Sequence, residues 1–528
     1  MKTWTSSLLA LGAVLLAALP AAAQNFPTDD PVIEAMWTEG MENSQAWSIG
    51  QAMLDSIGPR LTGTPAVDLA NRWAETVMSG WGVDARVEEY GTWKGWERGV
   101  THVDLLEPRV RTLDAMLMAW SPGSGGTVEG GVATFPDVGD AEAFQAWLPS
   151  AEGNFVALAM PQPSCRPTSS YEEHGTEAQA ESVREKRREM RLAWNQRMEA
   201  IGLEPVEMIA AIEDAGALGI LWSDWTGAWG SRRIFALNTR FGAATARIPA
   251  LDLSCEDYGL VWRLAARDQG PVLRVTAEAT MMDDVPVANV IGEIRGTELP
   301  DEYVVLSAHF DSWDGGSGAT DNGTGSIVMM EAMRILAEAY PNPKRTILVG
   351  LWASEEQGLN GSRAFVADHP EVIEGLQAAF NQDNGTGQIA RASAMGLVSA
   401  SGNIAGWMSQ LPRDISGKVD LTFPGSPSGG GSDHAAFNCT GAPTVGLGSS
   451  SWDYFSYTWH TNLDTFDKIV WENVRNNATM VAMLAYLASE DERVSRDVRA
   501  TVINRRTGEP AEWPSCEDGA RETNARYR

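Results

Sequence analysis

The sequence predicts an α/β protein in which helices cover both faces of a mostly parallel, mixed sheet. Short, fully apolar runs of strand length recur between residues 285 and 487, and segments with helical periodicity, such as Ser326–Ala339, lie between them. Strands that alternate with helices in this way favour a parallel sheet. The 528 residues also exceed what one hydrophobic core usually serves, so we expect more than one domain.

The main part of this α/β domain is predicted at residues 280–490. Four buried-type strands are expected there, at Tyr303–Ala308, Thr346–Trp352, Ala378–Gln382 and Pro443–Gly448. Ligands of such sheets sit at the carboxyl ends of the strands. The functional residues are therefore sought directly after these four runs.

Residues 24–114 are predicted to form a first part of the same domain. Helical periodicity extends over Ala35–Met78 with a break at residues 57–60, and strands are expected at Val83–Tyr90 and Gly99–Leu106. Residues 115–279 differ, because short apolar runs alternate with turn residues and with one charged helix at Ser182–Met198. That stretch is interpreted as an inserted, β-rich domain that shapes the substrate site or has a structural role.

The N-terminus is typical of an export signal, and we expect residues 1–23 to be removed. Lys2 precedes the apolar run Leu8–Leu19, and Ala21–Ala23 supplies a small-residue cleavage site. The protein is thus expected in the periplasm or outside the cell, with no membrane segment in its mature form. The tail at residues 491–528 is polar and is expected to be ordered only where it docks.

Residue types that bind metals follow the predicted strands. The first strand leads into His309 and Asp311, and a glycine-rich loop then reaches Asp321. The remaining candidates follow the other three strands: Glu355 and Glu356, Asp383, and His460. Because the carboxyl ends of parallel strands share one edge of a sheet, we expect these side chains to converge.

Two imidazoles and three carboxylates suit zinc, with cobalt or manganese as substitutes. Five ligands serve two metals if one carboxylate is shared, and Asp321 is the natural bridge. One Zn²⁺ would bind His309, Asp321 and Asp383, and the other would bind Asp321, Glu356 and His460.

Two further carboxylates have expected roles at this site. Glu355 adjoins a ligand and is predicted to be the general base that takes a proton from the metal-activated water. Asp311 is predicted to orient the imidazole of His309 through its second ring nitrogen.

Composition limits the partners. The formal net charge of −30 argues against a nucleic-acid partner and against binding to anionic lipid. The four cysteines, Cys165, Cys255, Cys439 and Cys516, contain no CxxC pair, so a thiolate zinc site is not expected. Disulfides are expected in an exported chain, but the three possible pairings remain open.

At these residues the sequence resembles the co-catalytic zinc exopeptidases, a family that includes carboxypeptidase Q, bacterial leucyl aminopeptidases and glutamate carboxypeptidase II. The matching stretches are His309–Asp314, Gly318–Gly323, Ala353–Gly358, Asn381–Asn384, Gly431–His434 and His460–Thr465. The short loop from His309 to Asp321 and the segment Gly58–Gly63 resemble the carboxypeptidase Q branch. The resemblance implies that the insertion at 115–279 is a protease-associated domain. It also implies the roles given above for the five ligands, Glu355 and Asp311, and a homodimer is plausible on the same ground.

The resemblance implies hydrolysis of dipeptides or short peptides at a chain end. Aminopeptidase, carboxypeptidase and dipeptidase activities remain open, as does the side-chain preference. Arg363 and Arg391 are candidates for binding a terminal carboxylate, and Tyr454 or Tyr457 for stabilising the oxyanion. The alternatives are another amide hydrolase or a glutaminyl-cyclase-like cyclotransferase on the same fold, and a non-catalytic relative, which should lack the ligands.

Overall fold

The computed structural model describes residues 29–237, 247–503, 508–510 and 512–523, so the predicted signal peptide lies outside the described residues. Its strands form one 14-stranded sheet. At the centre of the catalytic part, β14 (Thr444–Ser449), β11 (Leu376–Gln382), β9 (Leu299–His309) and β10 (Arg345–Trp352) are parallel neighbours. Antiparallel pairing of β10 with β8 (Val272–Ile294) makes the sheet mixed, and the predicted fold class is confirmed.

Alternation along β9 explains why the central strands are apolar throughout. Val304, Leu306 and Ala308 belong to one buried cluster, whereas Val305 belongs to a cluster on the other face. Successive side chains of a strand point to opposite faces, so a strand with helices on both sides is apolar at every position.

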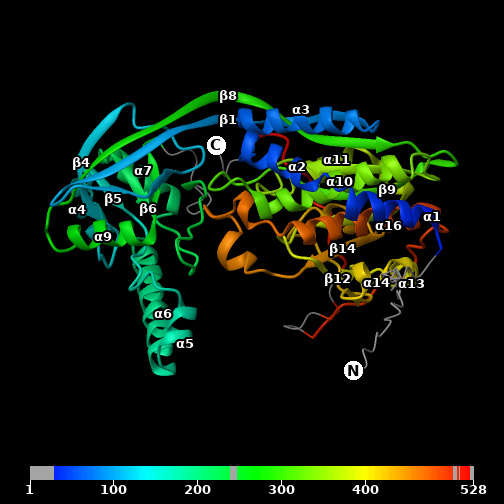
Figure 1. Cartoon of the computed structure of the whole chain (residues 1–528). Helices are drawn as coiled ribbons and strands as arrows, with labels where there is room; N and C mark the ends of the chain where they lie inside the picture. The colour runs from blue at the N-terminus through cyan, green and yellow to red at the C-terminus, as the bar shows by residue number, and fades with distance from the viewer. Residues whose placement is uncertain (1–28, 238–246, 504–507, 511, 524–528) are drawn as a thin grey trace, which may run out of the picture.

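Helices cover each face of this central sheet (Figure 1). On one face, α10 (Thr324–Ala339) packs against α16 (Trp471–Glu490), and both contribute to the cluster that holds Leu306. On the other face lie α11 (Asn360–Asp368), α12 (Pro370–Gly375) and α15 (His434–Asn438), which supply Phe365, Val372 and Phe437. The remaining helices of the catalytic part are α1 (Pro31–Trp37), α2 (Ala46–Gln51), α3 (Pro65–Gly80), α13 (Ser401–Gln410) and α14 (Arg413–Ser416).

The sheet continues toward residues 115–279 through two long strands (Figure 1). β1 (Asp84–Glu107) pairs with β8 over most of its length, so the two separate strands expected between residues 83 and 106 are one strand. The predicted boundary between residues 279 and 280 falls inside β8. The two parts of the chain therefore share a continuous two-stranded connection.

Residues 115–279 contain one end of this sheet, together with several helices. Four parallel strands, β4 (Thr127–Thr134), β5 (Asn154–Ala157), β6 (Gly219–Trp222) and β7 (Ala250–Leu253), follow the predicted apolar runs. The charged helix is α6 (Glu177–Ala200), which projects from the rest of the molecule together with α5 (Thr168–His174) (Figure 1). Among the described residues of this region, the other helices are α4 (Ala141–Trp147), α7 (Pro205–Asp214) and α9 (Cys255–Ala265).

The expectation of a β-rich composition is not met in the described part of residues 115–279, where helices contain more residues than strands. Much of the helical content is α6, whose Thr176 and Gln179 form a capping box. A charged, solvated helix of this kind buries little apolar surface. The pattern of apolar residues in the sequence therefore does not show how long the helix is.

The shorter strands complete the sheet. β2 (Arg111–Leu113) pairs with β1, and β3 (Ala115–Leu117) pairs with β7. At the opposite edge, β12 (Ile389–Ser393) lies between β14 and β13 (Asp420–Thr422).

The cysteine pairing that the sequence left open is Cys165–Cys255 and Cys439–Cys516. The second disulfide joins α15 to the C-terminal tail, which docks on the catalytic part rather than extending from it. Residues 513–523, called the C-terminal strap below, reach as far as β1, where the N–H of Thr92 donates to the carbonyl of Arg521 at 2.8 Å. Within the described residues, none of the helices combines the length and the apolarity needed to cross a membrane.

Candidate metal centre

The parallel register of the central strands brings the predicted ligands to one edge. Trp352 of β10 pairs with His309 at the end of β9, and Asn381 of β11 pairs with Ser307. The chain therefore leaves all three strands at the same level, so that His309, the Glu355–Glu356 turn and Asp383 lie next to one another. Asp321 comes from the turn Ala319–Gly323 before α10, and His460 follows the turn Tyr454–Thr458.

The five predicted ligands form two groups that share Asp321. One contains His309, Asp321 and Asp383, and the other contains Asp321, Glu356 and His460. In each group the possible ligand atoms lie within 4.8 Å of one another. This division matches the sets expected from the sequence, and Glu355 is in neither group.

The distances within the groups fit a small divalent cation. His309 Nε2 lies 3.6 Å from Asp321 Oδ1 and 3.5 Å from Asp383 Oδ1. His460 Nε2 lies 3.1 Å from Asp321 Oδ2 and 2.9 Å from Glu356 Oε2. Ligands about 2.0–2.1 Å from a tetrahedral zinc ion are separated by about 3.3 Å.

Unpaired buried atoms support the same fit. His309 Nε2 and Glu356 Oε1 are inaccessible to solvent, and neither has a hydrogen-bond partner among the described residues. Buried polar atoms almost always have partners, so these two exceptions need an explanation. A cation in each group would supply one, because it would accept a lone pair from His309 in one group and from Glu356 in the other.

Burial and mutual charge shift the ionisation of these groups. Burial alone lowers the pKa of His460, but the carboxylates of Glu356 and Asp321 outweigh it and raise that pKa to about 10. Burial raises the pKa of Glu356, although His460 opposes the shift. Burial also raises the pKa of Glu355 well above its usual value, with His309 acting in the opposite direction. A divalent cation bound between the carboxylates and imidazoles of these groups would favour their deprotonated forms.

Asp311 contacts both sides of the centre. Its carboxylate accepts hydrogen bonds from the backbone N–H of Glu355 at 3.0 Å and of Glu356 at 3.3 Å. The Nδ1 atom of His309 lies 3.0 Å from the backbone carbonyl of Asp311 and 3.6 Å from its carboxylate. The shorter contact with the predicted orienting residue is therefore through its backbone, while its carboxylate positions the Glu355–Glu356 turn.

Several other residues named from the sequence also lie at the centre. Tyr454 is buried, and burial together with the carboxylates of Asp321 and Asp383 raises its pKa well above the usual value. Ser432 Oγ accepts a hydrogen bond at 3.1 Å from Asn381, the residue two positions before Asp383. Asp433 is fully buried, and burial raises its pKa to about 7.

Two tryptophans close to the centre have different environments. Trp352 is a core residue whose Nε1 donates to Ser307 Oγ at 2.8 Å, so it is not a pocket wall. Trp459 stacks on the imidazole of His460 with 3.9 Å between ring centroids. Phe235, from the 115–279 region, contacts the same imidazole edge-on at 5.2 Å, so this region contributes to the wall of the centre.

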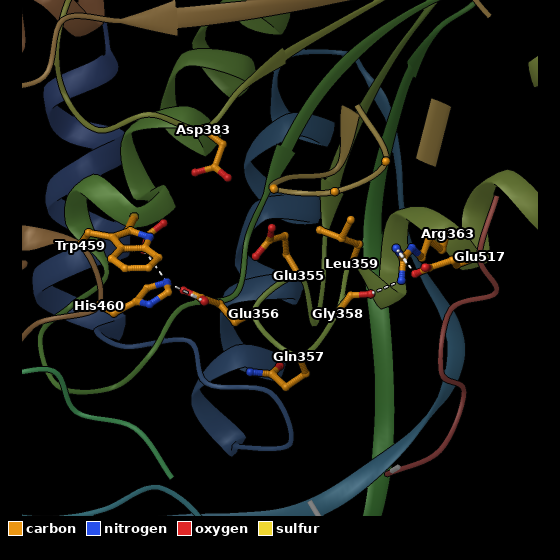
Figure 2. A pocket seen from close by; sticks show the side chains of 14 residues that line it. Glu355, Glu356, Gln357, Gly358, Leu359, Arg363, Asp383, Trp459, His460 and Glu517 are labelled. Atoms are coloured by element: carbon orange, nitrogen blue, oxygen red, sulfur yellow. Dashed lines mark hydrogen bonds and ion pairs between the residues drawn. The ribbon is translucent and has the colours of Figure 1, made fainter. Parts of the chain in front are cut away.

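A cavity of about 470 Å³ opens over the two groups. Asp383, Glu356 and His460 lie at one end of it, Glu355 and Leu359 lie in the middle, and Arg363 with Glu517 lies at the far end (Figure 2). Arg391 lines a separate cavity of about 190 Å³ on the other side of Asp383. Both arginines that the sequence singled out therefore lie near the centre, but in different cavities.

Three residues near the metal centre were given no role in the prediction from the sequence. Asp464 accepts hydrogen bonds from the N–H groups of Thr320 and Asp321, and Arg60 donates to carbonyls of the loop that follows His309. Both lie in stretches that were quoted as motifs without a role. Glu517 lies in the tail, and nothing in the sequence placed it near a pocket.

Comparisons with known proteins agree with the fold. Residues 289–485 match the model of peptidase family M28. Carboxypeptidase Q of Bos taurus is 25% identical over 442 residues, which cover 84% of each chain, and that of Mus musculus is 24% identical over 446 residues. The glutamate carboxypeptidase 2 homolog of Caenorhabditis briggsae is 32% identical over 206 residues, which cover 34% of this chain and 25% of that protein.

Two solved structures share the fold. A peptidase M28 precursor from Shewanella amazonensis has a TM-score of 0.62 at 23% identity and covers 87% of this chain and 96% of its own. A zinc aminopeptidase from Bacillus subtilis has a TM-score of 0.54 at 18% identity and covers 85% of this chain and 95% of its own.

The fold and the paired ligand groups, together with the M28 match, define a metallo-exopeptidase. The predicted family resemblance is confirmed: the chain is similar to the co-catalytic zinc exopeptidases and, over most of its length, to carboxypeptidase Q.

Proposed function

We propose that the chain is an exported exopeptidase that uses two zinc ions and Glu355 to hydrolyse dipeptides or short peptides. The observation that carries the proposal is the pair of three-residue ligand groups sharing Asp321 at the base of a cavity that also contains Glu355. The residues that would hold the ions are His309 and Asp383 on one side, Glu356 and His460 on the other, and Asp321 between them. Zinc at such positions polarises the scissile carbonyl and makes water acidic enough to lose a proton near neutral pH.

The chain itself supplies the proton transfer and the positioning. Glu355 is buried and belongs to neither ligand group, so its carboxylate is free to accept a proton from water and return it to the leaving amine. Asp311 fixes the backbone of Glu355, which limits the directions in which the carboxylate can approach a substrate.

Export is supported by the two disulfides, because they persist in oxidising compartments. The residues proposed as a signal peptide lie outside the described part of the chain. Residues 115–279 are proposed to be a protease-associated insertion, and Phe235, which touches the imidazole of His460, supports a role for it in shaping the site.

The test is hydrolysis of a peptide panel by the purified mature protein, with and without a chelator and added zinc. The panel contains free dipeptides, N-acetylated dipeptides and C-terminally amidated dipeptides. We expect cleavage that the chelator abolishes and zinc restores. Loss of roughly 10²–10⁴-fold in kcat for Glu355→Gln, with both ions retained, is expected for a general base. Zinc-independent cleavage, or normal turnover by Glu355→Gln, would contradict the proposal.

A further inference from the structure

The far end of the main cavity carries an arginine, whereas five carboxylates are distributed over its lining. The cavity is lined by the carboxylates of Asp321, Glu355, Glu356, Asp383 and Glu517. Arg363 is the one arginine or lysine among its described lining residues. The formal net charge of the chain is −30, so its acidic field disfavours entry of an anion. An anionic group of a substrate can therefore be stabilised in this cavity, away from the ligand groups, chiefly at Arg363.

Arg363 is built into the protein. Its side chain is 14% exposed, and its Nη1 donates to the carbonyl of Gly358 at 3.0 Å. Its Nη2 lies 2.6 Å from Glu517 Oε2, so the guanidinium is already oriented toward a carboxylate. A planar guanidinium is well suited to this recognition, because two of its N–H groups can face both oxygens of one carboxylate.

Arg363 and Glu355 belong to one short, hydrogen-bonded segment. The N–H groups of Gly358 and Leu359 both donate to the carbonyl of Glu355, at 2.8 and 2.9 Å, and the N–H of Arg363 donates to the carbonyl of Leu359 at 3.1 Å. The spacing between the proposed base and the guanidinium is thus set by the fold. A substrate that spans the two positions must have a fixed length between its scissile bond and its negative charge.

Glu517 is held at this position by the C-terminal strap. Cys516 is bonded to Cys439, and the N–H of Ala520 donates to Asn360 Oδ1 at 2.9 Å. A side chain at Gly519 would lie 2.4 Å from the carbonyl oxygen of Asn360, so only glycine lets the strap pass this close to α11. The side chain of Glu517 is nevertheless 65% exposed, so water can solvate its carboxylate when it leaves Arg363.

We propose that Arg363 binds the terminal carboxylate of a short peptide and that Glu517 occupies this site until the substrate displaces it. The inference deepens the proposed exopeptidase function and rests on it. The leaving portion of the substrate lies between Glu355 and Arg363, and the length of that segment restricts the enzyme to peptides that end close to the scissile bond. The C-terminal strap then acts as a specificity element, because Glu517 competes with substrate carboxylates.

The test compares three substrates with the zinc-loaded protein: Ala-Leu, its C-terminal amide, and Ala-Glu amide. For Arg363→Gln we expect kcat/KM on Ala-Leu to fall roughly 10- to 100-fold, mainly through KM, with less than about a threefold change on Ala-Leu amide. Arg363→Lys should restore part of the loss. Glu517→Gln should lower KM for Ala-Leu and leave the amide unchanged. Arg391→Gln tests the other arginine named from the sequence; because Arg391 lines the other cavity, this variant should keep the ratio of acid to amide, and a loss of that ratio would overturn the assignment to Arg363.

Equal losses on Ala-Leu and its amide in Arg363→Gln would overturn the inference, because they would mean that Arg363 only positions Gly358. The inference would also be overturned if Arg363→Gln lowered kcat/KM for Ala-Glu amide and for neither of the other two substrates. The carboxylate that Arg363 recognises would then belong to a side chain. Calorimetric binding of leucine and leucinamide provides a readout without turnover. Wild type should bind leucine more tightly than leucinamide, and Arg363→Gln should not. If no peptide is cleaved but wild type binds leucine more tightly than leucinamide, the proposed function fails and the carboxylate site stands. If wild type binds the two equally, the carboxylate site fails.

Discussion

The carboxylate of Asp464 holds the backbone of Asp321, whose N–H donates to Asp464 Oδ2 at 3.0 Å. The other oxygen of Asp464 accepts the N–H of Thr320 at 2.7 Å. Burial and the neighbouring Asp321 raise the pKa of Asp464 to about 7. The residue that both metal groups share is therefore positioned by a carboxylate that binds no metal itself.

Replacement of Asp464 by alanine should weaken zinc binding at both positions. The change leaves two buried N–H groups without their acceptor, and loss of residues that orient ligands typically reduces metal affinity about 10–100-fold. Zinc affinity is measured by competition with a chromogenic chelator. Asp467→Ala is the control, since Asp467 lies on the same loop with a side chain that is 72% exposed. Unchanged affinity in Asp464→Ala would show that the loop keeps its shape without this carboxylate.

The shared position of Asp321 predicts an asymmetry in metal content. His309→Ala should remove one ion and leave the group of Asp321, Glu356 and His460 intact. Asp321→Ala should weaken both groups, because each is left with two ligands. Zinc per chain, measured by mass spectrometry after dialysis, should be near two in wild type, near one in His309→Ala and well below one in Asp321→Ala. Equal contents in the two variants would exclude the bridging role.

The five ligands were predictable because each follows a strand of the same parallel sheet. The sequence shows where an apolar run ends, and a parallel sheet brings such ends together, so His309, Glu356 and Asp383 could be grouped without coordinates. His460 and Asp321 lie farther from their strand ends, after the turn Tyr454–Thr458 and within the turn Ala319–Gly323, so the same argument places them less directly.

The rest of the site could not be predicted, because it depends on contacts between segments that no periodicity relates. Glu517 reaches Arg363 only because a disulfide and the close passage of Gly519 hold the strap against α11. Phe235 meets His460 because residues 115–279 fold back toward the catalytic part. Such pairs carry no signal in a single sequence, where an acidic tail residue or an isolated phenylalanine resembles many others.

Replacement of the buried residue Arg60 is predicted to cause a large loss of stability. Its guanidinium donates to the carbonyls of Phe310, Ser317 and Gly318 and also to that of Gly58. Arg60→Met should lower the free energy of unfolding by about 3–5 kcal/mol, because the carbonyls lose a charged donor that no water can replace. The measurement is urea denaturation of the zinc-loaded protein.

The control for Arg60 is Arg72→Met, which removes an exposed arginine paired with Asp68 one helical turn away. Surface pairs of this kind contribute at most about 0.5 kcal/mol, so that variant should unfold like wild type. Similar unfolding midpoints for Arg60→Met and Arg72→Met would show that the loop after His309 does not depend on the guanidinium.

Removal of either disulfide should lower stability, but only removal of Cys439–Cys516 should change substrate preference. Removal of either pair by double Cys→Ala substitution is expected to cost about 2–4 kcal/mol of stability, since each closes a long loop, with sequence separations of 90 and 77 residues. Only the Cys439–Cys516 pair adjoins the cavity, through Glu517. Its removal should therefore raise the preference for a free dipeptide over its amide, as Glu517 would compete less well for Arg363. Loss of Cys165–Cys255 should leave that preference unchanged in steady-state assays performed well below the unfolding transition. The same shift in both variants would mean that the preference follows global stability and that the strap does not control it.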